Sequence, residues 1–89
     1  MNRCELIRRF VLNEIADDYE ELGKIYAEVA DLGTRSGLPI EKFEILQELI
    51  VLIESDLASA FILTTVPVQK IQGVPPLDKV EDYYFLVTD

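Results

Sequence analysis

The first segment of the chain repeats apolar residues at helical spacing. Between positions 4 and 16 they recur three or four places apart, with no Gly or Pro among them: Leu6, Ile7, Phe10, Val11 and Ile15. This period is typical of an amphipathic helix. Leu12 lies on roughly the opposite side when residues are set about 100° apart. We therefore predict a helix over 4–16 in which Leu12 points away from the main apolar stripe.

A second stripe of the same period covers 18–32: Tyr19, Leu22, Ile25, Tyr26, Val29 and Ala30. Asp18 and Glu21 have the spacing of a capping box, in which each side chain satisfies a backbone N–H at the helix start. Gly33 is a natural C-terminal stop. This pattern predicts a second helix over 18–32. One unbroken helix over 4–32 is the alternative, because the apolar spacing continues from Ile15 to Tyr19.

A third helix is predicted over 39–55. Gly33 and Gly37 indicate a tight turn before it, and Pro39 has the backbone angle that suits a first helical turn. Its apolar residues form a broad arc that we expect to be buried: Phe43, Ile45, Leu46, Leu49, Ile50 and Ile53. The residues expected on its outer side are mostly acidic, with one apolar residue among them: Glu41, Glu44, Glu48, Val51 and Ser55.

The pattern changes after Asp56, a residue type that tolerates a left-handed turn. Residues 58–65 and 83–88 are rich in small, aromatic or β-branched side chains and predict two strands. The connection between them contains three prolines and a glycine, which excludes a continuous strand there. A two-stranded hairpin is marginal alone in water, so we expect it to pack on the helices.

These elements predict an α+β fold: three helices followed by a two-stranded antiparallel hairpin, in one domain over 1–89. A chain of this length has room for one hydrophobic core. Its hydrophobic content of 49% is high enough to build that core, which excludes intrinsic disorder.

Charge narrows the classes of partner. Seventeen acidic residues against eight basic ones give a net charge of −9. The excess of carboxylates is spread over 16–32, 39–56 and 78–89, and no segment is a basic cluster. Nucleic acids and anionic membranes attract clustered Lys and Arg. The longest aliphatic run, Leu49–Ile53, is far shorter than the ~20 residues of a membrane-spanning helix. We therefore expect no membrane association.

The residue types also argue against catalysis. The chain has no histidine, which removes the common nucleophile–base pairs and most metal-protease motifs. Its one cysteine, Cys4, cannot form an internal disulfide or a Cys-rich metal site. Charges occupy the N-terminal positions where a signal peptide needs apolar residues. We predict a cytoplasmic protein that is not an enzyme, with no cofactor, no metal and no evident small-molecule substrate.

A possible anion site and a possible cation site in the sequence both have simpler structural explanations. The turn around Arg35, between Gly33 and Gly37, could cradle an anion on backbone N–H groups, but it lacks the lysine of a P-loop. The carboxylates of 17–21 could hold a hard cation, but no glycine bends a loop around them as in an EF-hand. A plain inter-helix turn and an acidic helix start explain these residues.

In order and spacing, the elements resemble the winged helix-turn-helix superfamily. Residues 19–32 match the second helix, 39–55 the recognition helix, and 58–65 with 83–88 the wing; Asp56 stands where the family often has glycine. The resemblance is a pattern of apolar spacings that covers most of the chain. It implies duplex DNA binding, with the third helix in the major groove and the wing on the backbone or minor groove.

The third helix departs from that expectation. Only Lys42 and Gln47 on it, with Arg35 in the preceding turn, are suited to contact DNA, and carboxylates would face the phosphates. We therefore predict a protein-interaction module, with a DNA-binding domain of a transcription regulator as the alternative.

The predicted partner is a second copy of the chain or another protein. Candidate contact residues are Leu12, Val51 and one of Tyr83 and Tyr84, since adjacent residues of a strand point to opposite sides. We expect the contact to be centred on the first helix, in a symmetric dimer.

Overall fold

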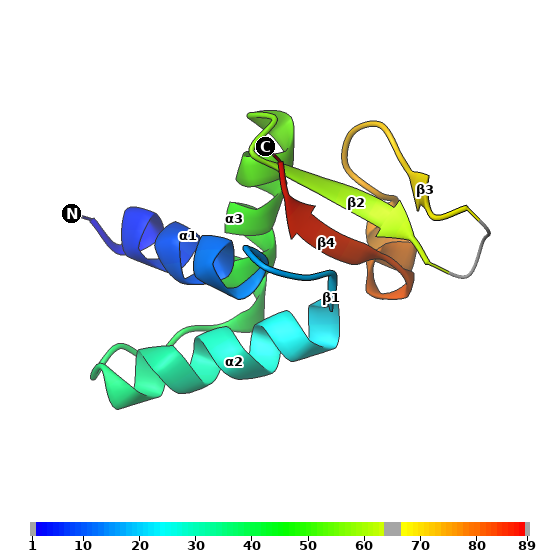
Figure 1. Ribbon diagram of the computed structural model, residues 1–89. Coiled ribbons are helices and arrows are strands. Elements are labelled where there is room, and N and C mark those ends of the chain that lie inside the picture. The colour runs from blue at the N-terminus through cyan, green and yellow to red at the C-terminus, as the bar shows by residue number, and fades with distance from the viewer. Residues whose placement is uncertain (1, 64–66, 89) are drawn as a thin grey trace.

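The computed structural model describes residues 2–63 and 67–88 and has an α+β architecture (Figure 1). Three α-helices lie on one side of a four-stranded antiparallel sheet, and a short 3-10 helix precedes the last strand. The helices are α1 (Arg3–Glu14), α2 (Leu22–Arg35), α3 (Lys42–Glu54) and η1 (Leu77–Asp82). The strands are β1 (Glu20–Glu21), β2 (Ala58–Ile62), β3 (Gln69–Lys70) and β4 (Tyr84–Val87).

Residues 15–21 are not helical and separate α1 from α2, so the alternative of one helix over 4–32 is wrong. The predicted start at Asp18 is also wrong. The Asp18 carboxylate accepts a hydrogen bond from the backbone N–H of Tyr19 at 2.7 Å, and the helix begins only at Leu22. Glu20 and Glu21 are extended instead, because their backbone pairs with Phe85 and Tyr84 of β4.

Gly33 does not end α2, which continues to Arg35. Gly33 is buried, and a β-carbon there would stand 2.5 Å from the carbonyl oxygen of Leu38. The chain reverses at Gly37, whose φ is +75°. The turn was therefore predicted correctly, but the role predicted for Gly33 is wrong. Because Gly33 has no side chain, the segment after the turn packs closely against α2.

α3 begins at Lys42, three residues after the predicted start, and the Glu44 side chain accepts a hydrogen bond from the N–H of Glu41 at 3.1 Å. Its end is a Schellman motif: the N–H of Leu57 donates to the carbonyl of Leu52 at 2.8 Å. Asp56 has the left-handed conformation that this motif requires, with φ +61°. The predicted left-handed turn at Asp56 is confirmed.

The sheet has the order β1-β4-β2-β3. β2 and β4 pair antiparallel with Ala58 opposite Val87, which confirms that the two predicted strands form a pair. β2 ends at Ile62, and positions 64 and 65 of the predicted strand lie outside the described residues. The expectation of a two-stranded sheet is wrong, because β1 adds to the free edge of β4 and β3 to that of β2.

The core lies between the three helices and the inner face of the sheet. Its largest fully buried side chains are Phe85, Ile7, Ile15, Leu22, Ile25, Ile45, Leu49, Leu52, Val11 and Val29. The helices α1, α2 and α3 and the strand β4 contribute to this set, and Ala58 and Ala60 of β2 belong to the same hydrophobic cluster.

Candidate functional site

Two carboxylates expected on the outside of α3 lie instead against α1. Glu48 is only 4% exposed, and Arg8 Nη2 lies 2.9 Å from its Oε1. Arg3 Nε donates to Glu44 Oε2 at 2.7 Å, and Arg3 also donates to the carbonyl of Pro39. The expectation that Glu44 and Glu48 point outward from α3 is therefore wrong. α1 packs along this side of α3 and brings a guanidinium to each carboxylate.

The hydrogen bonds from Arg3 and from the backbone N–H of Glu41 lower the pKa of Glu44 from 4.5 to about 2. The Glu44 carboxylate therefore binds a proton less readily in the folded protein than in the unfolded chain. The stability from this pair is fully present above the unfolded pKa and is lost as the pH falls toward the folded one.

We expect Glu44→Gln to be less stable than the unmodified protein near neutral pH, with the difference shrinking between pH 4.5 and about 2. Thermal unfolding followed by circular dichroism across this range measures the difference. Glu54→Gln is the matched control, because Glu54 lies on the same helix without an ion pair in the described part of the chain. A difference between Glu44→Gln and the unmodified protein that is constant down to pH 2 would contradict the assignment.

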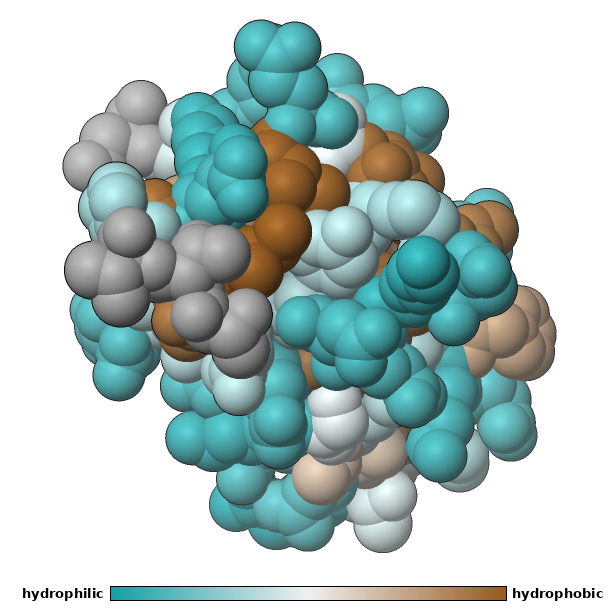
Figure 2. All heavy atoms as spheres, turned by 90° about the vertical axis from the view of Figure 1, so that its right-hand side faces the viewer, coloured by the Kyte–Doolittle hydropathy of each residue, from teal (hydrophilic) through white to brown (hydrophobic). Residues whose placement is uncertain are grey.

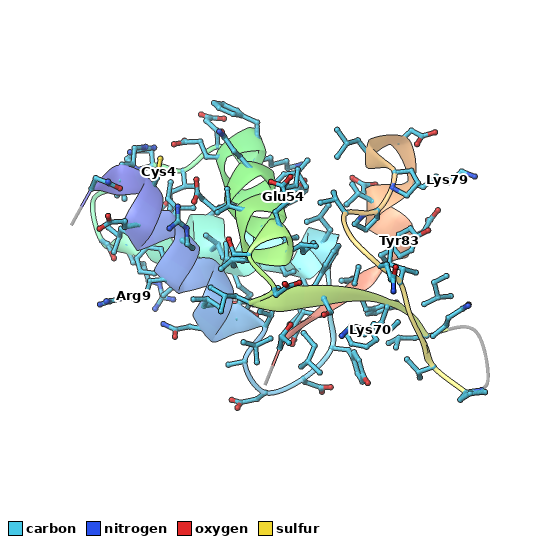
Figure 3. All side chains as sticks on the ribbon, turned by 90° about the horizontal axis from the view of Figure 1, so that it is seen from above. Cys4, Arg9, Glu54, Lys70, Lys79 and Tyr83 are labelled. Atoms are coloured by element: carbon cyan, nitrogen blue, oxygen red, sulfur yellow. The ribbon has the colours of Figure 1, made fainter. Side chains whose placement is uncertain are left out.

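The solvent-facing side of α3 is largely apolar. We define the outer face of α3 as Phe43, Gln47, Ile50, Val51 and Glu54. Phe43 is 68% exposed, so its prediction as a buried residue is wrong. Ile50 and Val51 are half-exposed, and Leu46, at the edge of this face, packs partly against the core. In Figure 3, Glu54 lies on the side of α3 away from α1 and Arg9.

The residues predicted to contact a partner fall into separate places. Leu12 is half-buried against the core, because α2 and α3 both pack on α1 and widen its covered side. The solvent side of α1 is polar, with Arg9 and Asn13 exposed. The structure therefore gives no support to an interface centred on Leu12. Val51 lies on the outer face of α3, where sequence reasoning placed it.

Tyr83 and Tyr84 meet at a different site. Both are half-exposed and line a depression of about 480 Å³ with Lys79 and Asp82 of η1. Figure 3 shows Tyr83 and Lys79 at the η1 end of the molecule. This depression does not include Leu12 or Val51 in its lining.

The three residues suited to DNA contact are also dispersed. Arg35 is ion-paired with Asp31 at 2.9 Å, one turn earlier on α2. The Lys42 Nζ lies 5.8 Å from the centre of the Tyr26 ring, on the side of α3 that faces α2. Partial burial and the Glu81 carboxylate raise the pKa of Tyr26. Only Gln47 lies within the outer face itself.

The cations do not form a patch. Four of them are ion-paired with carboxylates: Arg3, Arg8, Lys24 and Arg35. The other four lie on four different elements: Arg9 on α1, Lys42 on α3, Lys70 on β3 and Lys79 on η1. Figure 3 shows Arg9, Lys70 and Lys79 well apart. No surface among the described residues concentrates positive charge.

The acidic residues that the structure describes are not clustered as metal ligands either. No group of three or more Cys, Asp or Glu in the described ranges is placed to hold a metal ion. Burial and the nearby carboxylates of Glu28 and Glu20 raise the pKa of Glu14.

A depression of about 440 Å³ lies between the end of α3, β2 and the chain after β3. Ser59 and Thr88 line it and share a hydrogen bond of 3.2 Å between their hydroxyl oxygens. Figure 2 shows hydrophobic atoms gathered on the face of the molecule that lies at the right of Figure 1. Val68 is 43% exposed and Leu77 62% exposed.

No helix among the described residues is both long enough and apolar enough to cross a membrane. The chain matches no family model, no curated protein and no solved structure.

Proposed function

We propose that this chain is a non-catalytic protein-interaction module on a winged-helix-like scaffold, and that the outer face of α3 is its contact surface. The observation that carries the proposal is the exposure of Phe43, at 68%, beside half-exposed Ile50 and Val51. Exposed single apolar residues are common on monomers, but a set on one helix face is typical of an interaction site.

The order of elements supports the scaffold. β1 follows α1 and pairs with β4, which in turn pairs with β2 after α3. A winged-helix domain would use β2 and β4 as its wing, with β3 and η1 as an insertion between them. In that arrangement α3 takes the place of the recognition helix, which is the element such a scaffold presents to its ligand.

The chemistry of α3 favours a protein ligand over DNA. A DNA-reading helix presents Arg, Lys, Asn or Gln to the base edges and cations to the phosphates. The outer face offers Gln47 and ends in Glu54, and Lys42 lies on the side of α3 that faces α2. Apolar and aromatic side chains without surrounding charge are instead typical of the centre of a protein interface.

We expect no measurable binding of a fluorescently labelled DNA duplex at an ionic strength of about 0.15 M. The physical reason is the net charge of −9 and the absence of a cationic patch among the described residues. Fluorescence anisotropy measures this directly. Micromolar or tighter binding that falls steeply with added salt and is lost in Lys42→Glu would support the DNA-binding alternative.

Photo-crosslinking tests the proposed surface in cells. Benzoylphenylalanine placed at position 43 should form adducts with protein, whereas the same group at position 9, on the polar side of α1, should not. Mass spectrometry then identifies the adduct. Equal crosslinking from both positions, or adducts with nucleic acid alone at position 43, would contradict the proposal.

A further inference from the structure

The strand β3 covers only part of the edge of β2. It pairs with the last two residues of β2, and beyond them the N–H of Ile71 donates to the carbonyl of Ala60 at 3.0 Å. Continued pairing would place Gly73 opposite Ala58, but Gly73 has a φ of +75°, which is not a strand conformation. The chain turns away from β2 there (Figure 1). The first part of β2, at Ala58, therefore has no strand beside it on this edge.

The backbone groups of Ala58 point to this open edge. In an antiparallel pair, hydrogen-bonded and non-hydrogen-bonded positions alternate. The carbonyl of Leu57 accepts a hydrogen bond from the N–H of Thr88 at 2.9 Å, on the side of β4. At the next position Ala58 lies opposite Val87, whose N–H donates to the carbonyl of Ile15 at 3.1 Å and so points away from β2. Ala58 and Val87 are therefore a non-hydrogen-bonded pair, and the N–H and carbonyl of Ala58 face away from β4.

These two backbone groups have no hydrogen-bond partner in the part of the chain that the structure describes. Ala58 is only 2% exposed. Buried backbone N–H and carbonyl groups almost always have a partner, because leaving them unpaired is costly. Ala58 lines the depression of about 440 Å³ beside β2. A ligand in this depression would supply the missing donor and acceptor.

The same depression presents a cation and two hydroxyl groups. Lys70 lies opposite Phe61, two residues after Ser59 on β2, so Lys70 and Ser59 share one face of the sheet. Ser59 and Thr88 share a hydrogen bond of 3.2 Å. Lys70 is exposed beside β2 (Figure 3) and makes no ion pair with the described residues. The volume is within the ~300–1,000 Å³ of ligand pockets.

We propose that this depression binds the end of an extended peptide that has a free C-terminal carboxylate. A peptide residue in extended conformation offers one acceptor and one donor on the same edge, which are the complement of the N–H and carbonyl of Ala58. The peptide carboxylate pairs with Lys70. This site goes beyond the proposed function, because none of its lining residues belongs to the outer face of α3.

The charges of the site select the direction of the peptide. Lys70 lies at the β3 end of the depression, opposite Phe61, and Asp56 lies at the other end, before β2 begins. A peptide that runs parallel to β2 brings its carboxylate to Lys70. The antiparallel direction would bring the same carboxylate toward Asp56 and is therefore disfavoured.

The first experiment is a nuclear magnetic resonance titration of the isotope-labelled full chain. The probe is the tripeptide acetyl-Val-Thr-Val with a free carboxylate, added up to about 5 mM, a concentration suited to dissociation constants near 1 mM. The amide proton of Ala58 should shift downfield with saturation and exchange more slowly with solvent, because it gains a hydrogen bond. An Ala58 amide that is unchanged at the highest concentration would overturn the proposal.

The second experiment tests the carboxylate. The same tripeptide with a C-terminal amide should bind about two- to fivefold more weakly, the range expected for an exposed ion pair. Lys70→Gln should bind the two tripeptides equally well. Lys79→Gln is the matched control and should keep the preference, because Lys79 also lacks an ion pair among the described residues but lies on η1, outside the depression. A preference that persists in Lys70→Gln would overturn the assignment of Lys70.

The third experiment tests the main chain. The tripeptide with N-methylated peptide bonds should no longer shift the Ala58 amide, because it has no donor for the carbonyl of Ala58. If acetate alone produces the same shift as the tripeptide, the site binds a small carboxylate and the proposed peptide is wrong. Each of these outcomes is independent of crosslinking from position 43, which reports on the outer face of α3, so the proposed function and this inference fail separately.

Discussion

Replacing Phe85 with Ala is expected to lower the free energy of unfolding by about 3–5 kcal/mol. Phe85 is fully buried in β4, the strand that lies between β1 and β2. Its removal takes an aromatic side chain from the meeting point of sheet and helices and leaves a cavity that the surrounding elements cannot fill. Domains of this size are stable by only about 5–13 kcal/mol, so a large part of the protein should unfold at moderate urea concentrations. Urea titration followed by far-ultraviolet circular dichroism measures the change.

Phe43→Ala is the matched control for this prediction. It removes the same side chain from a position that is 68% exposed, and we expect a change within about 0.5 kcal/mol. The contrast tests the arrangement of the fold, since the sequence pattern predicts a buried Phe43 and the structure leaves it exposed. Similar losses of stability in the two variants would show that Phe43 is buried and would remove the basis of the proposed interaction surface.

The second large effect is expected at the ion pair between α1 and α3. Arg8→Met should lower the free energy of unfolding by about 2–4 kcal/mol, because it leaves the nearly buried carboxylate of Glu48 without its cation. The Glu48 side chain is 5% exposed and that of Arg8 is 35% exposed. The partial exposure of Arg8 places the effect below that of a fully buried pair. The same urea titration measures it.

Removing both charges should restore most of this stability. In Arg8→Met/Glu48→Leu the two helices would meet through apolar side chains of similar volume, which often stabilise a protein as well as the buried pair they replace. If the loss in free energy of unfolding in the double variant equals the sum of the losses in the two single variants, the pair acts through its specific geometry. Arg9→Met is the control for the loss of an arginine from the solvent side of the same helix.

These experiments bear on function because the two sides of α3 make different contacts. One side forms the ion pairs Arg3–Glu44 and Arg8–Glu48 with α1, and the buried residues of α3 pack in the core. The outer face is left free of both structural contacts. A rigidly held helix with a free apolar face is a favourable binding element, because little conformational entropy is lost when it docks.

Much of the local structure followed from the order of residues. The 3.6-residue period located the three long helices within a few residues at each end, and the change of pattern after Asp56 located β2 and β4. These features depend on neighbours in the chain: the spacing of apolar side chains, and the tolerance of Asp for the left-handed conformation at the end of α3. The charge and the absence of histidine likewise needed no structure.

The sheet edges depended on contacts between distant parts of the chain. β1 is two glutamates that no strand pattern marks, and it forms because their backbone groups meet the open edge of β4, more than sixty positions away. β3 pairs with β2 over a much shorter separation, with Phe61 opposite Lys70, and its two residues lie in a connection where only a continuous strand was excluded. Backbone hydrogen bonds between strands do not depend on the identity of the side chains. A short edge strand therefore has no distinctive pattern in the sequence.

The direction of each side chain on α3 was decided in the same way. A helical wheel gives the angle between Phe43 and Glu48 but not which of them faces the protein. α1 supplied Arg8 for Glu48, so a carboxylate became buried, and no element of the described chain covers Phe43. The sequence by itself determined which helices and central strands would form, because these depend on local spacing. The tertiary structure alone decided which face of α3 is left for a partner, because that depends on which distant residues pack against it.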